Sequence, residues 1–142
     1  MTTAIRSIET GEDLAYEVRI EAPVELVWRY WTEPDRLIRW MGKVATIDPR
    51  PGGVFRVDYG QGDVVSGEFV DVAGGRQATF TWGWETPDGR AEAGRVEIEL
   101  TDDAGATVLR LRHAGLDAES RKSHDEGWCH FLPQLVEAVA QK

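Results

Sequence analysis

The three histidines are the residues of this chain best suited to acid–base or metal chemistry. His113 ends a strand-like stretch on its apolar face, and His124 precedes Trp128 by one helical turn, so both rings can serve one pocket. No Ser, Cys or carboxylate stands at the spacing of a catalytic triad, so we favour structural roles and assign no catalytic residue. His124 and His130 are six residues apart and fall on different helix faces, so no metal site and no cofactor are predicted.

Charged side chains offer a few candidate polar anchors for a ligand. Arg56 and Asp58 alternate with Phe55, which predicts that they face solvent. Glu68 belongs to a strand with apolar residues on both faces. Buried, it would be a ligand-binding or catalytic carboxylate with a raised pKa, but a surface position is favoured. Cys129 adjoins an apolar helix stripe and is interpreted as a small packing residue.

Composition limits the class of protein. The chain has 142 residues, 42% of them hydrophobic, which predicts one domain over residues 1–142. Its net charge of −9 argues against nucleic acid or an anionic membrane as a partner. No stretch approaches the ~20 apolar residues that a membrane helix needs, so no membrane insertion is predicted. The polar residues 1–11 predict no signal peptide, and with a single cysteine, Cys129, the expected location is cytoplasmic.

Two short helices are predicted after the first strand. Residues 1–12 are expected to form a flexible segment, and the alternation in Leu14–Glu21 predicts a strand. Beyond Pro23, the apolar residues of 24–31 recur at helical spacing. Pro34 ends that helix and begins a second one, predicted over Pro34–Trp40.

From residue 43 to residue 113 the pattern is that of strands separated by glycine-rich turns, which predicts an antiparallel sheet. The inward face of Val64–Val72 stays unassigned, because both of its faces carry apolar residues. Thr86–Gly94, with its proline and Asp-Gly pair, is predicted to be a longer loop. The other predicted strands of this region before the last hairpin are Val44–Asp48, a strand through Phe55–Tyr59, and Ala78–Trp84.

Charge sets the register of the last predicted hairpin. Apolar and charged residues alternate over 95–100 and again over 108–113. With a loop at Asp103–Ala106, Glu97 and Glu99 face arginines of the second strand, and Val96 faces His113. A shift by two residues keeps the apolar match but loses these charge pairs, so the charges select the register.

The chain returns to a helical period after Gly115. Asp117 is a predicted N-cap, and Pro133 is predicted to kink the helix. The apolar stripe of this helix consists of Trp128, Phe131, Leu132, Leu135, Val136 and Val139. A sheet with one apolar face and a helix with one apolar stripe together predict an α+β domain of two layers.

In this order and spacing, several short motifs resemble the START-like (SRPBCC, helix-grip) superfamily. Within it they are similar to the AHSA-type group, which is named after the activator of the heat-shock-protein ATPase. The resemblance covers about residues 14–140 and rests on Ala22-Pro-Val-Glu-Leu-Val-Trp28, Thr32-Glu-Pro34 with Trp40, Asp48-Pro-Arg-Pro-Gly-Gly53, Phe80-Thr-Trp82, His113-Ala-Gly115, and His124-Asp-Glu-Gly-Trp128 followed by Leu132 and Leu135.

The resemblance implies a helix-grip fold. In that fold a curved antiparallel sheet of about six or seven strands wraps a long C-terminal helix, two short helices follow the first strand, and a cavity lies between sheet and helix. Superfamily members bind lipids, sterols, polyketides or hormones, act as cyclases, or regulate a chaperone ATPase. The eukaryotic chaperone activator carries a further N-terminal domain that has no counterpart in these 142 residues.

Six tryptophans in so short a chain are hard to bury by filling alone, so some are expected to line a cavity. We predict a binding module for a small apolar or amphipathic molecule, as a monomer or homodimer. One alternative is a cyclase or hydrolase acting on a polyketide-like or aromatic substrate, and another is a co-chaperone-like regulator with a chaperone partner. The predicted ligand-binding residues are Trp40, Phe55, Val57, Tyr59, Phe69, Phe80, Trp82, Trp84, Ile98, Leu111, His113, Trp128 and Leu132.

Overall fold

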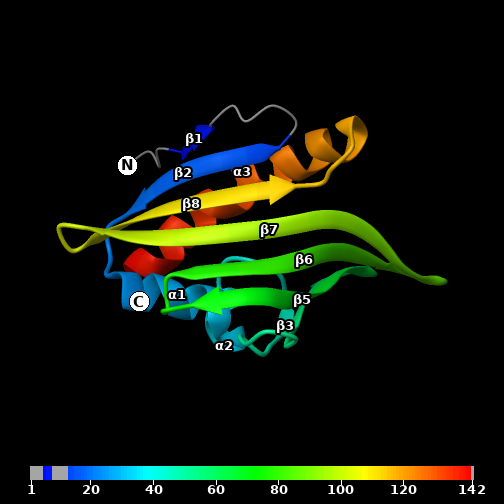
Figure 1. Cartoon of the computed structure of the whole chain (residues 1–142), viewed down its shortest axis with the longest axis horizontal. Helices are drawn as coiled ribbons and strands as arrows, with labels where there is room; N and C mark the ends of the chain where they lie inside the picture. The colour runs from blue at the N-terminus through cyan, green and yellow to red at the C-terminus, as the bar shows by residue number, and fades with distance from the viewer. Residues whose placement is uncertain (1–4, 8–12, 142) are drawn as a thin grey trace.

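Eight antiparallel strands form one curved sheet in the order β1-β2-β8-β7-β6-β5-β4-β3, and the long helix α3 crosses one face of it (Figure 1). The computed structural model describes residues 5–7 and 13–141. The strands are β1 (Ile5–Ser7), β2 (Leu14–Ile20), β3 (Val44–Ile47), β4 (Val54–Gly60), β5 (Asp63–Ala73), β6 (Gln77–Thr86), β7 (Gly89–Asp103) and β8 (Ala106–Ala114). The helices are α1 (Val24–Thr32), α2 (Pro34–Leu37) and α3 (Ala118–Gln141). The predicted α+β helix-grip class is confirmed.

The N-terminal region differs from the prediction in two details. Ile5–Ser7 lies in the segment expected to be flexible, yet it pairs with β2 as an additional edge strand. The other residues of the segment 1–12 lie outside the described residues. The second helix, α2, ends at Leu37 rather than at Trp40, because its last turn tightens and the Trp40 N–H donates to the Leu37 carbonyl, three residues back, at 3.1 Å.

The prediction of a loop over Thr86–Gly94 is wrong, because most of these residues form the paired arms of β6 and β7. Thr86 pairs with Gly89, which leaves the two residues between them as a tight turn. The first four residues of β7 are all exposed, so the alternation that marks a half-buried strand is absent there. This hairpin projects past its neighbours at one end of the sheet (Figure 1).

The β7–β8 hairpin has the predicted register. Val96 lies opposite His113, and both predicted charge pairs stand opposite each other. Arg110 faces Glu99 and also donates to Glu17 of β2 at 3.0 Å. The charge pattern therefore continues across three neighbouring strands on the outer face of the sheet.

The long helix α3 begins as predicted. The Asp117 carboxylate accepts the Ser120 backbone N–H at 2.8 Å, and this N-cap hydrogen bond holds the pKa of Asp117 below its ordinary value. The helix continues through Pro133. Leu132, Leu135 and Val139 of its apolar stripe are completely buried. The apolar face of α3 therefore packs against the sheet and α1.

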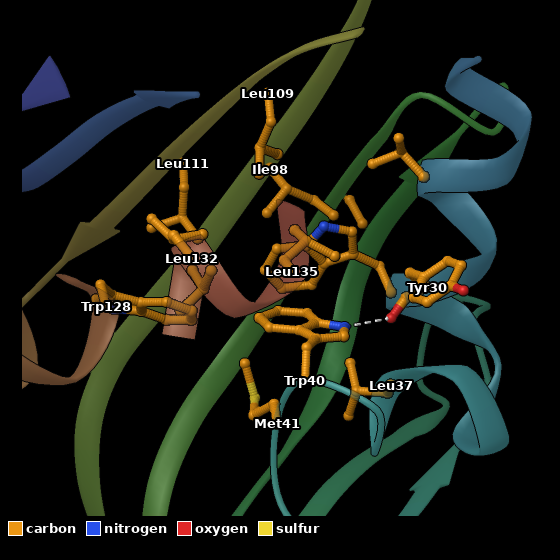
Figure 2. Close-up of a cluster of buried hydrophobic side chains, with 14 of the residues drawn as sticks. Tyr30, Leu37, Trp40, Met41, Ile98, Leu109, Leu111, Trp128, Leu132 and Leu135 are labelled. Carbon is orange, nitrogen blue, oxygen red and sulfur yellow. Dashed lines mark hydrogen bonds between the residues drawn. The ribbon is translucent and has the colours of Figure 1, made fainter. Parts of the chain in front are cut away.

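The core is densest where α1 and α2 close over the sheet. Trp31 of α1 meets Trp40 at a centroid distance of 4.8 Å. The Trp40 indole N–H donates to the Tyr30 carbonyl at 2.9 Å, a bond that Figure 2 draws as a dashed line. Phe55 and Phe80 stack on each other with ring centroids 4.3 Å apart, and Phe80 lies 6.4 Å from Trp31. These side chains are at most 1% exposed, so this part of the core is closed to solvent.

The strand whose facing was unassigned, β5, turns Val65 and Phe69 into this core. Glu68 is exposed, as favoured from the sequence. Its carboxylate therefore has no role at a buried site.

Candidate functional site

A pocket of about 490 Å³ lies between the sheet and the N-terminal part of α3. Its volume is in the range of pockets that hold small molecules. The lining residues come from β4, β5, β6, α3 and the segment after α2, and they are Met41, Tyr59, Asp63, Trp82, Trp84, Ser123, His124, Gly127, Trp128 and Phe131. Strand alternation places Trp82 and Trp84 on the same face of β6, and helical spacing aligns the α3 residues with them.

Aromatic rings form most of the pocket wall, and they lie in several planes. Trp82 and Trp84 are nearly perpendicular, at 88°. Trp82 and Trp128 approach to 5.3 Å between centroids with an interplanar angle of 45°. Tyr59 and Phe131 approach to 5.5 Å at 37°. The pocket is therefore bounded on several sides rather than by two parallel faces.

His113 lies behind this wall and is fully buried. Its Nε2 lies 2.6 Å from the Ala93 carbonyl, and its Nδ1 lies 3.1 Å from the indole Nε1 of Trp128. An indole N–H only donates, so Nδ1 is the acceptor and Nε2 carries the proton of a neutral ring. Burial lowers the pKa of His113 to about 4, in agreement with this neutral form.

His124 repeats the same arrangement at the pocket surface. Its Nε2 accepts the indole N–H of Trp84 at 3.1 Å, and its Nδ1 lies 2.7 Å from the Ser120 carbonyl. The two imidazole centroids are 5.0 Å apart. Both histidines thus orient a tryptophan of the pocket wall, and the nitrogens of both rings are engaged within the protein.

The polar groups at the pocket are few. Asp63 is the one charged residue among the lining residues, and no lysine or arginine stands with it. The Ser123 hydroxyl donates to the Ser120 carbonyl at 3.1 Å. Burial raises the pKa of the Tyr59 hydroxyl, so that group stays protonated. A Cβ added at Gly127 would meet nothing within 4 Å, so the helix surface is open to the pocket there.

The structure divides the residues predicted to bind a ligand into two groups. Tyr59, Trp82, Trp84 and Trp128 line the pocket. The remaining predicted residues are buried and do not line it: Trp40, Phe55, Val57, Phe69, Phe80, Ile98, Leu111, His113 and Leu132.

Six pocket residues were absent from the predicted set: Met41, Asp63, Ser123, His124, Gly127 and Phe131. Two of them carried a usable signal. His124 stands four residues before Trp128 on the same helix face, and Phe131 belongs to the apolar stripe of that helix. Gly127 carried none, because a glycine in a helix says nothing about the space beside it.

Outside the pocket, two charged or reactive candidates are accounted for by their surroundings. Arg56 is half-buried and donates to the Glu85 carboxylate at 2.9 and 3.1 Å, an ion pair that lowers the pKa of Glu85. Cys129 is exposed, contrary to the packing role expected from the sequence, because it lies beside the buried stripe rather than in it.

Among residues 5–7 and 13–141, no cluster of three or more His, Cys, Asp or Glu side chains is arranged to hold a metal ion. Within the same residues, no helix combines the length and the apolar character that crossing a membrane requires.

A curved sheet that grips a C-terminal helix beside an aromatic pocket defines the START-like class of domains. Residues 21–140 match the family model described as Activator of Hsp90 ATPase homolog 1-like protein, and the chain belongs to this family. Comparison with curated proteins found no match.

Solved structures share the fold. CalU16 from Micromonospora echinospora is 29% identical with a TM-score of 0.74, over 97% of this chain and 83% of that one. DynU16, described as a protein in the dynemicin biosynthetic locus, is 26% identical with a TM-score of 0.77, over 92% of this chain and 48% of that one. This chain therefore spans about half of DynU16. MLL2253 from Mesorhizobium loti is 23% identical with a TM-score of 0.79, over 92% of this chain and 98% of that one, and shows the fold alone.

Proposed function

We propose that this chain is a binding module for a small hydrophobic or amphipathic molecule held between the sheet and α3. The observation that carries the proposal is the pocket of about 490 Å³ with tryptophan, tyrosine and phenylalanine walls. Burying apolar ligand surface against such walls is favourable. Membership of the family and the likeness to DynU16, ascribed to a biosynthetic locus, support a small organic ligand.

Binding is favoured over catalysis by the state of the histidines. His113 is buried, and its two ring nitrogens are occupied by Trp128 and a backbone carbonyl. His124 is occupied by Trp84 and Ser120. Among the lining residues, no nucleophile is hydrogen-bonded to a base in the manner of an activated pair.

A pocket-filling variant tests the proposal. N-phenyl-1-naphthylamine is uncharged and fluoresces strongly in an apolar site, so it reports binding without presupposing a ligand charge. Gly127→Leu places a side chain in the open space beside the helix and raises helix propensity, so the protein stays folded. We expect the variant to bind the probe at least about tenfold more weakly, a change of about 1.4 kcal/mol.

The matched control is Glu126→Leu, which adds the same side chain at an exposed neighbouring position outside the pocket. It should bind the probe as the unsubstituted protein does. Equal affinity of Gly127→Leu and the unsubstituted protein would contradict the proposal, because the probe would then occupy another surface. Native mass spectrometry of the purified protein would identify a ligand that is retained.

A cyclase or hydrolase acting on a polyketide-like or aromatic substrate is the second candidate, and His124 on the pocket wall is the observation that favours it. Turnover of such a substrate that survives His124→Phe would remove this candidate. The co-chaperone alternative rests on the name of the family, and stimulation of a heat-shock-protein ATPase by the purified chain tests it. Cell fractionation and light scattering test the expected cytoplasmic location and the monomer or homodimer.

A further inference from the structure

The pocket has no positive charge to offer a ligand. No lining residue is lysine or arginine, and the one charged residue, Asp63, is exposed at the edge. Asp63 takes part in no ion pair among the described residues. A carboxylate or phosphate ligand would meet this negative charge, on a chain of net charge −9, without a compensating cation.

Several polar groups of the pocket wall are already used. The indole N–H of Trp84 is donated to His124, and the Ser123 hydroxyl is donated to a backbone carbonyl. Two lining groups have no hydrogen-bond partner among the described residues: the indole N–H of Trp82, which is shielded from solvent, and the Tyr59 hydroxyl. A neutral polar group would therefore find few hydrogen-bonding partners, and a group that needs none is the better match.

The ring geometry selects a rounded group over a flat one. Stacking of a flat ligand between two rings requires parallel faces, whereas the lining ring pairs are inclined by 34° for Tyr59 and Trp84 up to 88° for Trp82 and Trp84. A compact cation can approach several ring faces that differ in orientation. The cation–π contacts in the described part of the chain are those of Arg36 and Arg39 with Tyr30, away from the pocket, so the protein itself leaves these faces uncovered.

From the charge, the engaged polar groups and the ring planes together, we infer that the ligand carries an organic ammonium group. That group is a quaternary ammonium on an apolar body, with its charge among the pocket rings and near Asp63. This inference rests on the proposed function and names the ligand class for the same pocket.

Two probes of the same shape and different charge test the inference. Benzoylcholine carries a trimethylammonium group, and 3,3-dimethylbutyl benzoate carries an uncharged tert-butyl group in its place. Each is titrated against the protein loaded with N-phenyl-1-naphthylamine. We expect benzoylcholine to bind about tenfold more tightly, although the uncharged ester is the more hydrophobic.

Equal or tighter binding of the uncharged ester would overturn the inference and leave the proposed function intact. Displacement of the bound naphthylamine by neither probe would also overturn it. Absence of naphthylamine binding altogether would instead contradict the proposed function, so the two failures are distinguishable.

Two charge variants separate the local carboxylate from the overall charge. Asp63→Asn should lower the ratio of cation affinity to ester affinity about threefold, the effect of removing one exposed charge pair. Asp71→Asn makes the same charge change at an exposed position of β5 outside the pocket and should leave the ratio unchanged. Equal effects of the two variants would overturn the assignment of Asp63.

Discussion

The two ends of the space between sheet and helix contain the same kinds of side chain in different states. At one end Trp31, Trp40 and Phe80 are at most 1% exposed and fill the core. At the other end Tyr59 and Trp84 are half-buried and border the pocket of about 490 Å³. We refer to these as the packed end and the open end.

The difference arises from what covers the sheet. At the packed end, α1 supplies Trp31. The centroid of its ring lies 6.4 Å from that of Phe80 on the sheet and 6.4 Å from that of Trp128 on α3. At the open end, α3 presents Gly127, which leaves the space beside it unfilled. Aromatic content alone therefore does not make a pocket, because the covering element decides whether the rings fill or enclose a space.

The largest expected contrast comes from removing one ring at each end. Phe80→Ala should lower the free energy of unfolding by about 3–5 kcal/mol, because it leaves a cavity among fully buried rings. Trp84→Ala should cost only about 1–2 kcal/mol, because its ring is half-buried and solvent can replace it. Urea denaturation measures both, and equal losses would show that the open end is packed as tightly as the other.

The next effect concerns His113, behind the pocket wall. Its pKa is about 4 in the folded protein and about 6.5 when unfolded, so the unfolded state binds the proton first. Stability is therefore complete above pH 6.5 and decreases as the pH falls toward 4, by about 3 kcal/mol from this residue. In the unsubstituted protein the free energy of unfolding should fall between pH 7.5 and pH 4 by about 3 kcal/mol more than it does in His113→Gln. The same pH dependence in both proteins would contradict a buried neutral ring.

A matched pair of Trp→Phe substitutions compares the two tryptophan–histidine contacts. Trp128→Phe should cost about 1–3 kcal/mol, because the acceptor nitrogen of the buried His113 is left without a donor. Trp84→Phe should cost about 0.5–1 kcal/mol, because water can reach His124. The loss of unfolding free energy should be larger for Trp128→Phe than for Trp84→Phe. The reverse order would contradict the assignment of His113 as the histidine shielded from water.

The smallest effect has the opposite sign. Gly127→Ala should raise the free energy of unfolding by about 1 kcal/mol, because its methyl group enters open space in a helix. Gly94→Ala should be destabilising, because Gly94 has a φ of +82° and its added Cβ would lie 1.9 Å from the Ala114 carbonyl oxygen. Thermal unfolding of the pair measures the contrast, and a loss at Gly127 would show that the pocket is filled there.

Local patterns predicted much of the fold. The β7–β8 register is confirmed because charge and apolar alternation coincide within a short stretch, and the N-cap at Asp117 depends on residues three apart. The strand arms around Thr86–Gly94 were missed because the first residues of β7 are exposed on both faces. Such residues do not show the alternation of apolar and polar side chains that marks a half-buried strand. The pairing of β6 with β7 in this segment depends on the neighbouring strand, and a local sequence pattern carries no information about that neighbour.

The pocket was less accessible to prediction than the fold. The alternation of apolar and polar residues correctly predicted that Phe55, Phe80 and Ile98 point inward. An inward side chain, however, can fill a core as well as line a pocket. Gly127 and Met41 reach the pocket through the placement of whole elements, for which the sequence holds no local signal.

The sequence by itself determined most of the elements, the inward faces of most strands, the register of one hairpin and the family to which the chain belongs. Only the tertiary structure decided which rings are packed and which enclose a space. The physical reason is that periodicity encodes the direction of a side chain relative to its own backbone. Contacts between residues far apart in the chain decide what a side chain meets in that direction. Trp31 meets another ring, that of Phe80, whereas the space beside Gly127 is empty.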